Sequence, residues 1–297
     1  MRKTTRLRQL IEDPRILVMP GVYDVLSGRL AQAAGFEAVQ ASGANIAACH
    51  YGVTDYGIVS MHEMVEQTGR IAAALDVPVM GDADTGFGNA VNAYLTVQAF
   101  ERAGVAGVNI EDQASPKRCG HLDGKVLLPF DEAVAKIAAA AAARSDPDFV
   151  INARTDALSV AGIDEVIRRG NAFLAAGATM VFVEGVDSEE TITRAVRGIG
   201  GPVAINLVEG GKSPQHLGFD ALQALGVARV SLPSTGMQAS IKALQTVYGR
   251  LREDGGIGGF PELLAGFGAA QRLLGSERIF ALEEQLLGPL KRGQGAQ

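Results

Sequence analysis

Short apolar runs recur along the chain, and each of them ends at a glycine or a polar residue. Their length and their β-branched content are typical of buried strands. The runs cover residues 16–21, 38–43, 77–82, 107–112, 149–154, 180–185, 202–207 and 229–234. The pattern of hydrophobic and polar positions therefore predicts eight strands.

Amphipathic helical patterns separate most of these strands. They cover residues 60–75, 90–103, 131–144, 163–176, 188–199 and 219–225. Strands that alternate with helices indicate an α/β protein with parallel β/α units. Eight such units over roughly 250 residues favour a closed (β/α)8 barrel of the TIM type. A doubly wound open sheet is the alternative, and it fits eight regularly spaced units less well.

The remaining segments lie at the two ends of the chain. We expect residues 1–13 to form a helix that covers the bottom of the barrel. Residues 254–290 are expected to form C-terminal helices, with breaks at Gly266, Gly268, Gly275 and Gly288. Nothing in residues 291–297 favours order, so they are expected to form a flexible tail. No linker is long enough to divide two domains, and residues 1–297 are expected to form a single barrel domain.

Composition narrows the class of protein. Hydrophobic residues make up 47% of the 297 residues and 37 residues are glycine, which suits a large core with many short turns. The net charge of −6 comes without a basic patch, which argues against a nucleic-acid partner. Two cysteines, Cys49 and Cys119, are too few for a disulfide framework. No secretory signal or membrane span is evident, so we expect a cytoplasmic protein without a membrane partner.

Polar and charged residues stand at the ends of seven of the eight predicted strands. In barrels of this kind the carboxyl ends of the strands form one rim, where function is located. The residues are Ser42, Gly43, Asp82, Asp84, Glu111, Asp112, Arg154, Asp156, Glu184, Asn206 and Ser234. Their convergence favours a functional site over a set of unrelated capping residues.

Asp82, Asp84 and Glu111 concentrate negative charge on this rim. Their repulsion must be relieved by protonation or by a cation. Oxygen ligands select a hard ion, so we predict Mg²⁺, with Mn²⁺ as the substitute. Such an ion keeps open positions at which an α-oxy carboxylate can chelate. Arg154 offers a planar fork for the same anion, and the amides of Ser42 and Gly43 can add donors.

The segment from Pro116 to His121 places Cys119 among Lys117, Arg118 and His121. Neighbouring positive charge favours the thiolate, and a loosely held proton suits an acid–base catalyst. We therefore predict that residues 113–125 form a lid that carries Cys119.

Other motifs carry less weight. Residues 86–91 (GFGNAV) lack the third glycine of a dinucleotide fingerprint. No strand end carries the lysine of a Schiff-base aldolase. Cys49 and His50 are adjacent on a helix and point apart, so a packed thiol is favoured over a dyad.

From residue 8 to residue 290 the chain resembles the isocitrate lyase/phosphoenolpyruvate mutase superfamily. The matching motifs are PGVYD at 20–24, Ser42-Gly43, Asp55, DADTGFG at 82–88, IEDQ at 110–113, KRCGH at 117–121, ARTD at 153–156, Glu184 and NLVEGGK at 206–212. The resemblance implies a Mg²⁺-dependent barrel that forms homotetramers, with a helix after strand eight exchanged between paired subunits.

The resemblance also implies roles for individual residues. The metal residues would be Asp82, Asp84, Glu111 and Asp55, acting directly or through water. The catalytic residues would be Cys119, Lys117, His121 and Glu184. The substrate-binding residues would be Tyr23, Ser42, Gly43, Ala44, Gly120, Arg154 and Asn206.

Within the superfamily, the cysteine loop resembles that of carbon–carbon lyases. The branch comprises 2,3-dimethylmalate lyase, the plant petal death protein, 2-methylisocitrate lyase and carboxyphosphonoenolpyruvate mutase. We expect cleavage of a 2-hydroxy dicarboxylate to pyruvate or another 2-oxo acid plus a carboxylate. Phosphonate mutase, oxaloacetate hydrolase or decarboxylase activity on the same scaffold is the alternative, and a non-catalytic 2-oxo-acid-binding protein is a further one. Ala44 departs from the glycine typical of methylisocitrate lyases, and residues 232–237 lack an extra cation for a third carboxylate.

Overall fold

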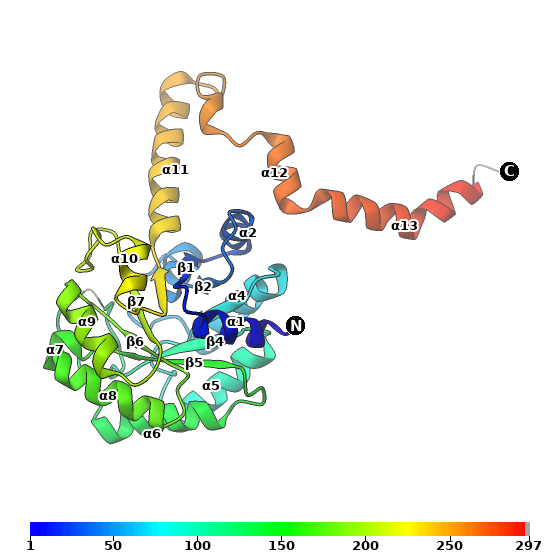
Figure 1. The fold of residues 1–297 in the computed structure, drawn as a ribbon. Coiled ribbons are helices and arrows are strands. Elements are labelled where there is room, and N and C mark those ends of the chain that lie inside the picture. The colour runs from blue at the N-terminus through cyan, green and yellow to red at the C-terminus, as the bar shows by residue number, and fades with distance from the viewer. Residues whose placement is uncertain (121, 295–297) are drawn as a thin grey trace. The chain divides into compact units, whose positions relative to one another are not determined.

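The computed structural model describes residues 1–120 and 122–294, and side chains as far as residue 287 (Figure 1). The chain divides into two compact units, Met1–Gln238 and the residues from Ala239 onward.

The first unit is a closed barrel of eight parallel strands in chain order, with β8 pairing back to β1 (Figure 1). The strands are β1 (Leu17–Val22), β2 (Val39–Ala41), β3 (Val79–Asp82), β4 (Gly107–Glu111), β5 (Val150–Thr155), β6 (Met180–Val183), β7 (Val203–Asn206) and β8 (Arg229–Leu232). Each predicted strand is present, and its bounds differ by no more than two residues. The predicted (β/α)8 barrel is therefore confirmed.

Helices surround this barrel in the predicted alternation. They are α1 (Lys3–Glu12), α2 (Val25–Ala33), α3 (Gly43–Ile46), α4 (Met61–Ala74), α5 (Ala90–Arg102), α6 (Phe130–Ala142), α7 (Leu158–Ala161), α8 (Ile163–Ala175), α9 (Glu189–Gly198) and α10 (Phe219–Ala224). A π-helical turn, η1 (Ala47–Tyr51), follows α3. Side chains fix several helix starts: at α4, the Ser60 hydroxyl accepts from the Glu63 N–H while the Glu63 carboxylate accepts from the Ser60 N–H.

The N-terminal end of the barrel is closed by α1. Its buried side chains Leu7, Leu10 and Ile11 pack with interior residues of the strands, among them Met19 and Met180. Because this end is filled by apolar side chains, the opposite rim is left for polar residues.

Strand register places the polar residues of that rim side by side. Glu111 on β4 pairs with Arg154 on β5, and Asn206 on β7 pairs with Ser231 on β8. The register therefore brings residues that are far apart in the sequence next to one another at one end of the barrel.

The C-terminal part of the chain is helical. Its elements are α11 (Thr235–Asp254), the 3₁₀ turn η2 (Pro261–Leu263), α12 (Phe267–Leu274) and α13 (Ser276–Gln294). Gly266 and Gly275 flank α12 with φ of 74° and 79°, a region that favours glycine. The predicted breaks at Gly268 and Gly288 are wrong, because both lie inside helices; a helical glycine costs only about 1 kcal/mol relative to alanine.

The helix α13 also continues past residue 291, where the tail was expected to begin, and residues 295–297 lie outside the described part of the chain. Within the described residues, no helix is both long and apolar enough to cross a membrane.

Candidate active site

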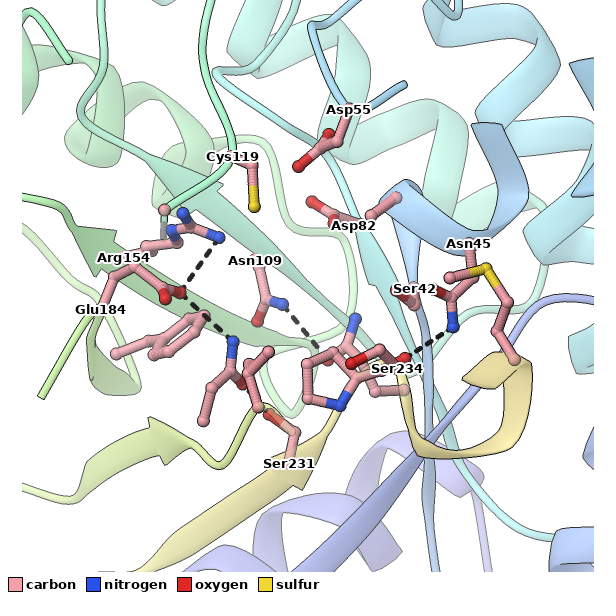
Figure 2. A pocket seen from close by; sticks show the side chains of 18 residues that line it. Ser42, Asn45, Asp55, Asp82, Asn109, Cys119, Arg154, Glu184, Ser231 and Ser234 are labelled. Carbon is pink, nitrogen blue, oxygen red and sulfur yellow. Dashed lines mark hydrogen bonds and ion pairs between the residues drawn. The ribbon is translucent and has the colours of Figure 1, made fainter. Parts of the chain in front are cut away.

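A cavity of about 150 Å³ lies at the carboxyl ends of the barrel strands (Figure 2). Nine of the predicted site residues line it: Ser42, Ala44, Asp55, Asp82, Cys119, Gly120, Arg154, Glu184 and Asn206. The predicted residues Tyr23, Gly43, Asp84, Glu111 and Lys117 are not part of the lining. The predicted His121 lies outside the described residues.

The carboxylate of Asp82 is held at the end of β3 by two backbone amides. Its Oδ2 accepts from the Gly43 N–H at 3.1 Å, and its Oδ1 accepts from the Asp84 N–H at 3.1 Å. A Cβ atom on Gly43 would lie 2.7 Å from Oδ2, so the approach requires glycine. Both carboxylate oxygens are thereby fixed at the edge of the cavity.

The backbone amides expected to bind the substrate have partners within the protein. The Ser42 N–H donates to the Val22 carbonyl at 2.9 Å, and the Gly43 N–H donates to Asp82. Ser42 still lines the cavity, so its hydroxyl, rather than these amides, is the group that this position can offer.

Lys117 lies between two of the predicted metal residues. Its buried Nζ is 2.5 Å from Asp55 Oδ1 and 2.7 Å from Asp84 Oδ1. Burial would lower the pKa of the Lys117 amine, but Asp84, Glu111 and Asp55 outweigh it and raise the pKa well above its ordinary value. Burial raises the pKa of Asp84 to about 6, against the opposing charge of Lys117. Lys117 thus ties the cysteine loop to the acidic side of the cavity.

Arg154 is surrounded by three carboxylates. Its Nε and Nη2 donate to the two oxygens of Asp156 at 2.8 and 3.0 Å. Its Nη1 lies 3.3 Å from Glu184 Oε2, and its Nε lies 3.2 Å from Glu111 Oε2. Burial would lower the pKa of the guanidinium, but Asp156, Glu111 and Glu184 outweigh it and raise the pKa. Asp156 holds the Nε–Nη2 edge of the guanidinium and Glu184 lies at Nη1, so each of the three nitrogens already faces a carboxylate.

Glu184 continues this cluster to the next strands. Its Oε2 accepts from Asn206 Nδ2 at 3.2 Å, and Asn206 Oδ1 in turn accepts from the Ser231 hydroxyl (Figure 2). The cluster therefore runs along one side of the cavity from β5 to β8.

Glu111 is buried beside Arg154. Burial raises its pKa well above the ordinary value, although Arg154 and Lys117 act in the opposite direction. Within the described residues, Glu111 Oε1 has no hydrogen-bond partner. A buried oxygen of this kind calls for a water molecule or another ligand.

The loop that carries Cys119 is braced by its own residues. Gln113 accepts from the Arg118 N–H at 3.0 Å and donates to the Arg118 carbonyl at 2.9 Å. Lys125 Nζ donates to the carbonyls of Gly120 and Leu122. Cys119 faces the cavity between Arg154 and Asp55 (Figure 2).

The acidic residues do not converge on a ready-made metal cluster. Asp84 is paired with Lys117, and Glu111 with Arg154. Among the residues that the structure describes, no three His, Cys, Asp or Glu side chains form a group that could hold a metal ion. Only Asp55 and Asp82, of the four predicted metal residues, line the cavity.

Several lining residues were missed in the sequence: Gln40, Asn45, Asn109, Phe182, Val208, Ser231 and Met237. Gln40, Asn109 and Ser231 lie within strands, and a polar residue inside an otherwise apolar run was the available signal. Val208 and Met237 carry no such signal, because only the closed barrel brings them to the cavity.

Comparison with curated proteins gives long matches. The chain is 38% identical to "2,3-dimethylmalate lyase" of Eubacterium barkeri over 283 residues, which is 95% of this chain and 98% of the relative. It is 41% identical to "2-methylisocitrate lyase" of Aeropyrum pernix over 249 residues, or 84% of this chain and 80% of the relative.

Solved structures agree with these matches. A 2,3-dimethylmalate lyase, described as a PEP mutase/isocitrate lyase superfamily member, has a TM-score of 0.89 and 34% identity, with 96% of this chain and 95% of that chain covered. A phosphonopyruvate hydrolase in complex with oxalate and Mg²⁺ has a TM-score of 0.87 and 34% identity, with 97% and 100% covered.

Residues 7–252 match the phosphoenolpyruvate phosphomutase family model, a span that includes every strand of the barrel and every residue lining the cavity. The predicted resemblance is therefore confirmed, and the chain belongs to the PEP mutase family within the PEP mutase/isocitrate lyase superfamily.

Proposed function

We propose that this enzyme is a divalent-metal-dependent carbon–carbon lyase. Its substrate is a 2-hydroxy dicarboxylate of the 2-alkylmalate or 2-methylisocitrate type, and its products are pyruvate or another 2-oxo acid plus a carboxylate. The observation that carries the proposal is the cavity, in which Asp82 and Asp55 face the Arg154 cluster with Cys119 between them (Figure 2). Similarity to two named lyases supports the reaction type.

The donor set fits a hydrated hard cation. Asp82 and Asp55 bring carboxylate oxygens to the cavity, and Glu111, whose Oε1 has no partner within the described residues, lies beside Arg154 of the lining. Mg²⁺ is commonly held by one or two carboxylates and keeps several waters, so a cluster of three direct side-chain ligands is not required. Asp82 would hold the ion, with Asp55, Asp84 and Glu111 acting through water. When bound, Mg²⁺ or Mn²⁺ would polarise the 2-oxy group and its carboxylate.

The chain's own residues would orient the substrate. Arg154 lines the cavity and attracts a substrate carboxylate through its positive charge. Asn206 and the Ser42 hydroxyl add polar contacts, and Lys117 keeps Asp55 and Asp84 in position. Glu184 fixes Asn206 and the Nη1 end of Arg154. Such fixed geometry lowers the entropic part of the barrier.

Cys119 would act as the acid. The bond between C2 and C3 breaks, and its electron pair remains on C3 of the departing carboxylate. The C2 hydroxyl gives its proton to a carboxylate of the cavity, and C2 becomes the carbonyl of the 2-oxo acid. The thiol proton of Cys119 is transferred to C3, which completes the second product.

The charge of the lining favours a dicarboxylate over a tricarboxylate. Among the described residues that line the cavity, Arg154 is the one cation, and three carboxylates already surround it. A third substrate carboxylate would be buried without a partner, which is costly. We therefore favour the 2-alkylmalate type over 2-methylisocitrate.

Phosphonate or oxaloacetate chemistry is the second candidate. The phosphonopyruvate hydrolase structure is as similar in identity as the lyase structure, at 34%. The same cavity would also serve a protein that binds 2-oxo acids without turning them over.

A substrate panel separates these functions. Release of a 2-oxo acid is measured with 2,3-dimethylmalate, 2-methylisocitrate, oxaloacetate and phosphonopyruvate, each with Mg²⁺ and after EDTA treatment. We expect the highest kcat/KM with the alkylmalate and loss of turnover without metal. Full activity after EDTA treatment, or turnover confined to phosphonopyruvate, would contradict the proposal.

The acid role of Cys119 is tested separately. Cys119→Ser should lower kcat by about 100-fold or more, as expected for the loss of a general acid, while oxalate and Mg²⁺ still bind. Calorimetry with oxalate and Mg²⁺ provides the binding control. Undiminished turnover in this variant would remove Cys119 from the mechanism.

We further propose a homotetramer built from dimers that exchange the helix after β8. The residues of α11 to α13 support it, because many of their large apolar side chains are exposed, including Tyr248 at 63% and Phe267 at 83%. We propose a cytoplasmic location, which suits a catalytic thiol that must remain reduced.

A further inference from the structure

Arg229 is a cation inside the barrel that the proposed chemistry does not use. It begins β8, and its side chain is fully buried at 0% exposure. Its Nη2 donates to Gln40 Oε1 at 2.7 Å, and its Nε lies 3.2 Å from Met19 Sδ. The guanidinium carbon is 5.8 Å from the centre of the Phe182 ring. Burial lowers the pKa of Arg229 to about 9, opposed by the Asp82 charge, so the group remains cationic at neutral pH.

A short chain of hydrogen bonds connects Arg229 with the floor of the cavity. Gln40 Oε1 also accepts from Asn109 Nδ2 at 3.2 Å, and both of these amides line the cavity. Gln40 Nε2 donates to the carbonyls of Ala41 and Met80 at 3.0 and 3.2 Å, which fixes the orientation of the amide. Arg229 is therefore one hydrogen bond away from the space that the substrate would occupy.

Stability does not account for an arginine at this position. Met19 and Phe182 beside it are apolar, and Arg229 Nη1 has no hydrogen-bond partner within the described residues. A buried charge that lacks a paired carboxylate is destabilising, and an apolar side chain of similar volume would fill the same space without that penalty. The positive charge of Arg229 must then act on groups in the cavity above it.

We propose that Arg229 is a positioning residue that holds Gln40 and places a fixed positive charge beneath the cavity. The described lining contains three carboxylates, Asp55, Asp82 and Glu184, and they disfavour an anionic substrate. Arg229 offsets this charge, strengthens binding of the dicarboxylate and weakens binding of a cation at Asp82. The inference rests on the proposed metal and anion sites.

The opposite effects on cation and anion provide the test. Mn²⁺ binding is measured alone by electron paramagnetic resonance, and oxalate binding is measured at saturating Mn²⁺ by calorimetry. Arg229→Met should bind Mn²⁺ several-fold more tightly and oxalate on the order of tenfold more weakly. Arg229→Lys, which keeps the charge, should stay within about threefold of wild type in both measurements.

A purely structural role would not produce this pattern. Asn152→Leu disturbs the same layer, through its bond to Asn109, without changing charge, and should not move the two affinities in opposite directions. Arg229→Met with both affinities unchanged, or both weakened, overturns the inference. If Arg229→Met and Arg229→Gln both fail to fold while Arg229→Lys folds, the cation is structural and the inference is also overturned. Failure of the wild-type protein to bind Mn²⁺ and oxalate would instead overturn the proposed function.

Discussion

Asp84 is a buried carboxylate whose pKa is raised by burial. It is buried, its backbone has a φ of 45° in the left-handed region, and its Oδ1 lies 2.7 Å from Lys117. Strained backbone of this kind is concentrated at functional sites. Its pKa of about 6, raised by burial from 3.8, lies above the value in the unfolded chain.

This shift predicts a pH-dependent effect of Asp84→Asn. Because the folded state binds the proton more tightly, the contribution of Asp84 to stability is fully present below about pH 4 and is lost as the pH rises through about 6. Asparagine does not titrate, so the variant should gain stability relative to wild type between pH 4 and 7, by at most about 3 kcal/mol.

Urea unfolding in EDTA at pH 4, 5, 6 and 7 measures the difference in the free energy of unfolding. Asp123→Asn is the control, because Asp123 is an exposed carboxylate whose partner Lys212 is also exposed. If the difference in the free energy of unfolding between Asp84→Asn and wild type does not change with pH, burial does not raise the pKa of Asp84.

Single residues also show how far the sequence predicts the site. Asp82, Arg154, Glu184 and Asn206 were predicted because each stands at a strand end, and strand ends are readable from local pattern. The hydrogen bond from Arg154 to Asp156 was not predicted, because it depends on the direction of the side chains. Arg229 was assigned no role, because its bond to Gln40 joins residues 189 positions apart and only the closed barrel brings them together.

Among the structural elements, the loop after β4 owes its position to one glycine, Gly120. A Cβ atom on Gly120 would lie 2.3 Å from Glu184 Cγ and 2.7 Å from Arg154 Nη2. The loop can therefore lie against the Arg154 cluster only because this position has no side chain. This contact keeps Cys119 over the cavity.

We expect Gly120→Ala to displace the loop and lower kcat by about 100-fold, the order of loss that follows a small misplacement of a catalytic group. Steady-state kinetics with the best substrate of the panel measures the effect, and thermal unfolding checks the fold. Gly218→Ala is the matched control, since a Cβ atom there meets open space. Equal activity of the two variants would mean that the loop does not need this close approach.

The elements themselves were predicted more completely than their side-chain contacts. Strand and helix periods are local, so all eight strands lie where the apolar runs are. The breaks predicted at Gly268 in α12 and Gly288 in α13 are wrong. A helix ends where the backbone adopts positive φ, as at Gly275, and a glycine alone does not impose that conformation.

At the scale of the whole molecule, the helices from α11 onward carry many exposed apolar side chains. Ile279 and Phe280 on α13 are 60% and 63% exposed, and Ile241 and Leu244 on α11 are each 49% exposed. Apolar surface of this extent is typical of a surface that another protein covers. A second copy of this chain is the occupant that the proposed helix exchange requires.

We therefore expect sedimentation of the wild-type protein as a tetramer and of Phe280→Glu as a smaller species, because a buried unpaired charge opposes association. Gln285→Glu, which adds the same charge at an exposed polar position of α13, should leave the tetramer intact. Sedimentation velocity at several concentrations distinguishes the two variants, and circular dichroism confirms that the barrel remains folded. A wild-type monomer, or a Phe280→Glu tetramer of unchanged stability, would require another explanation for these apolar helices.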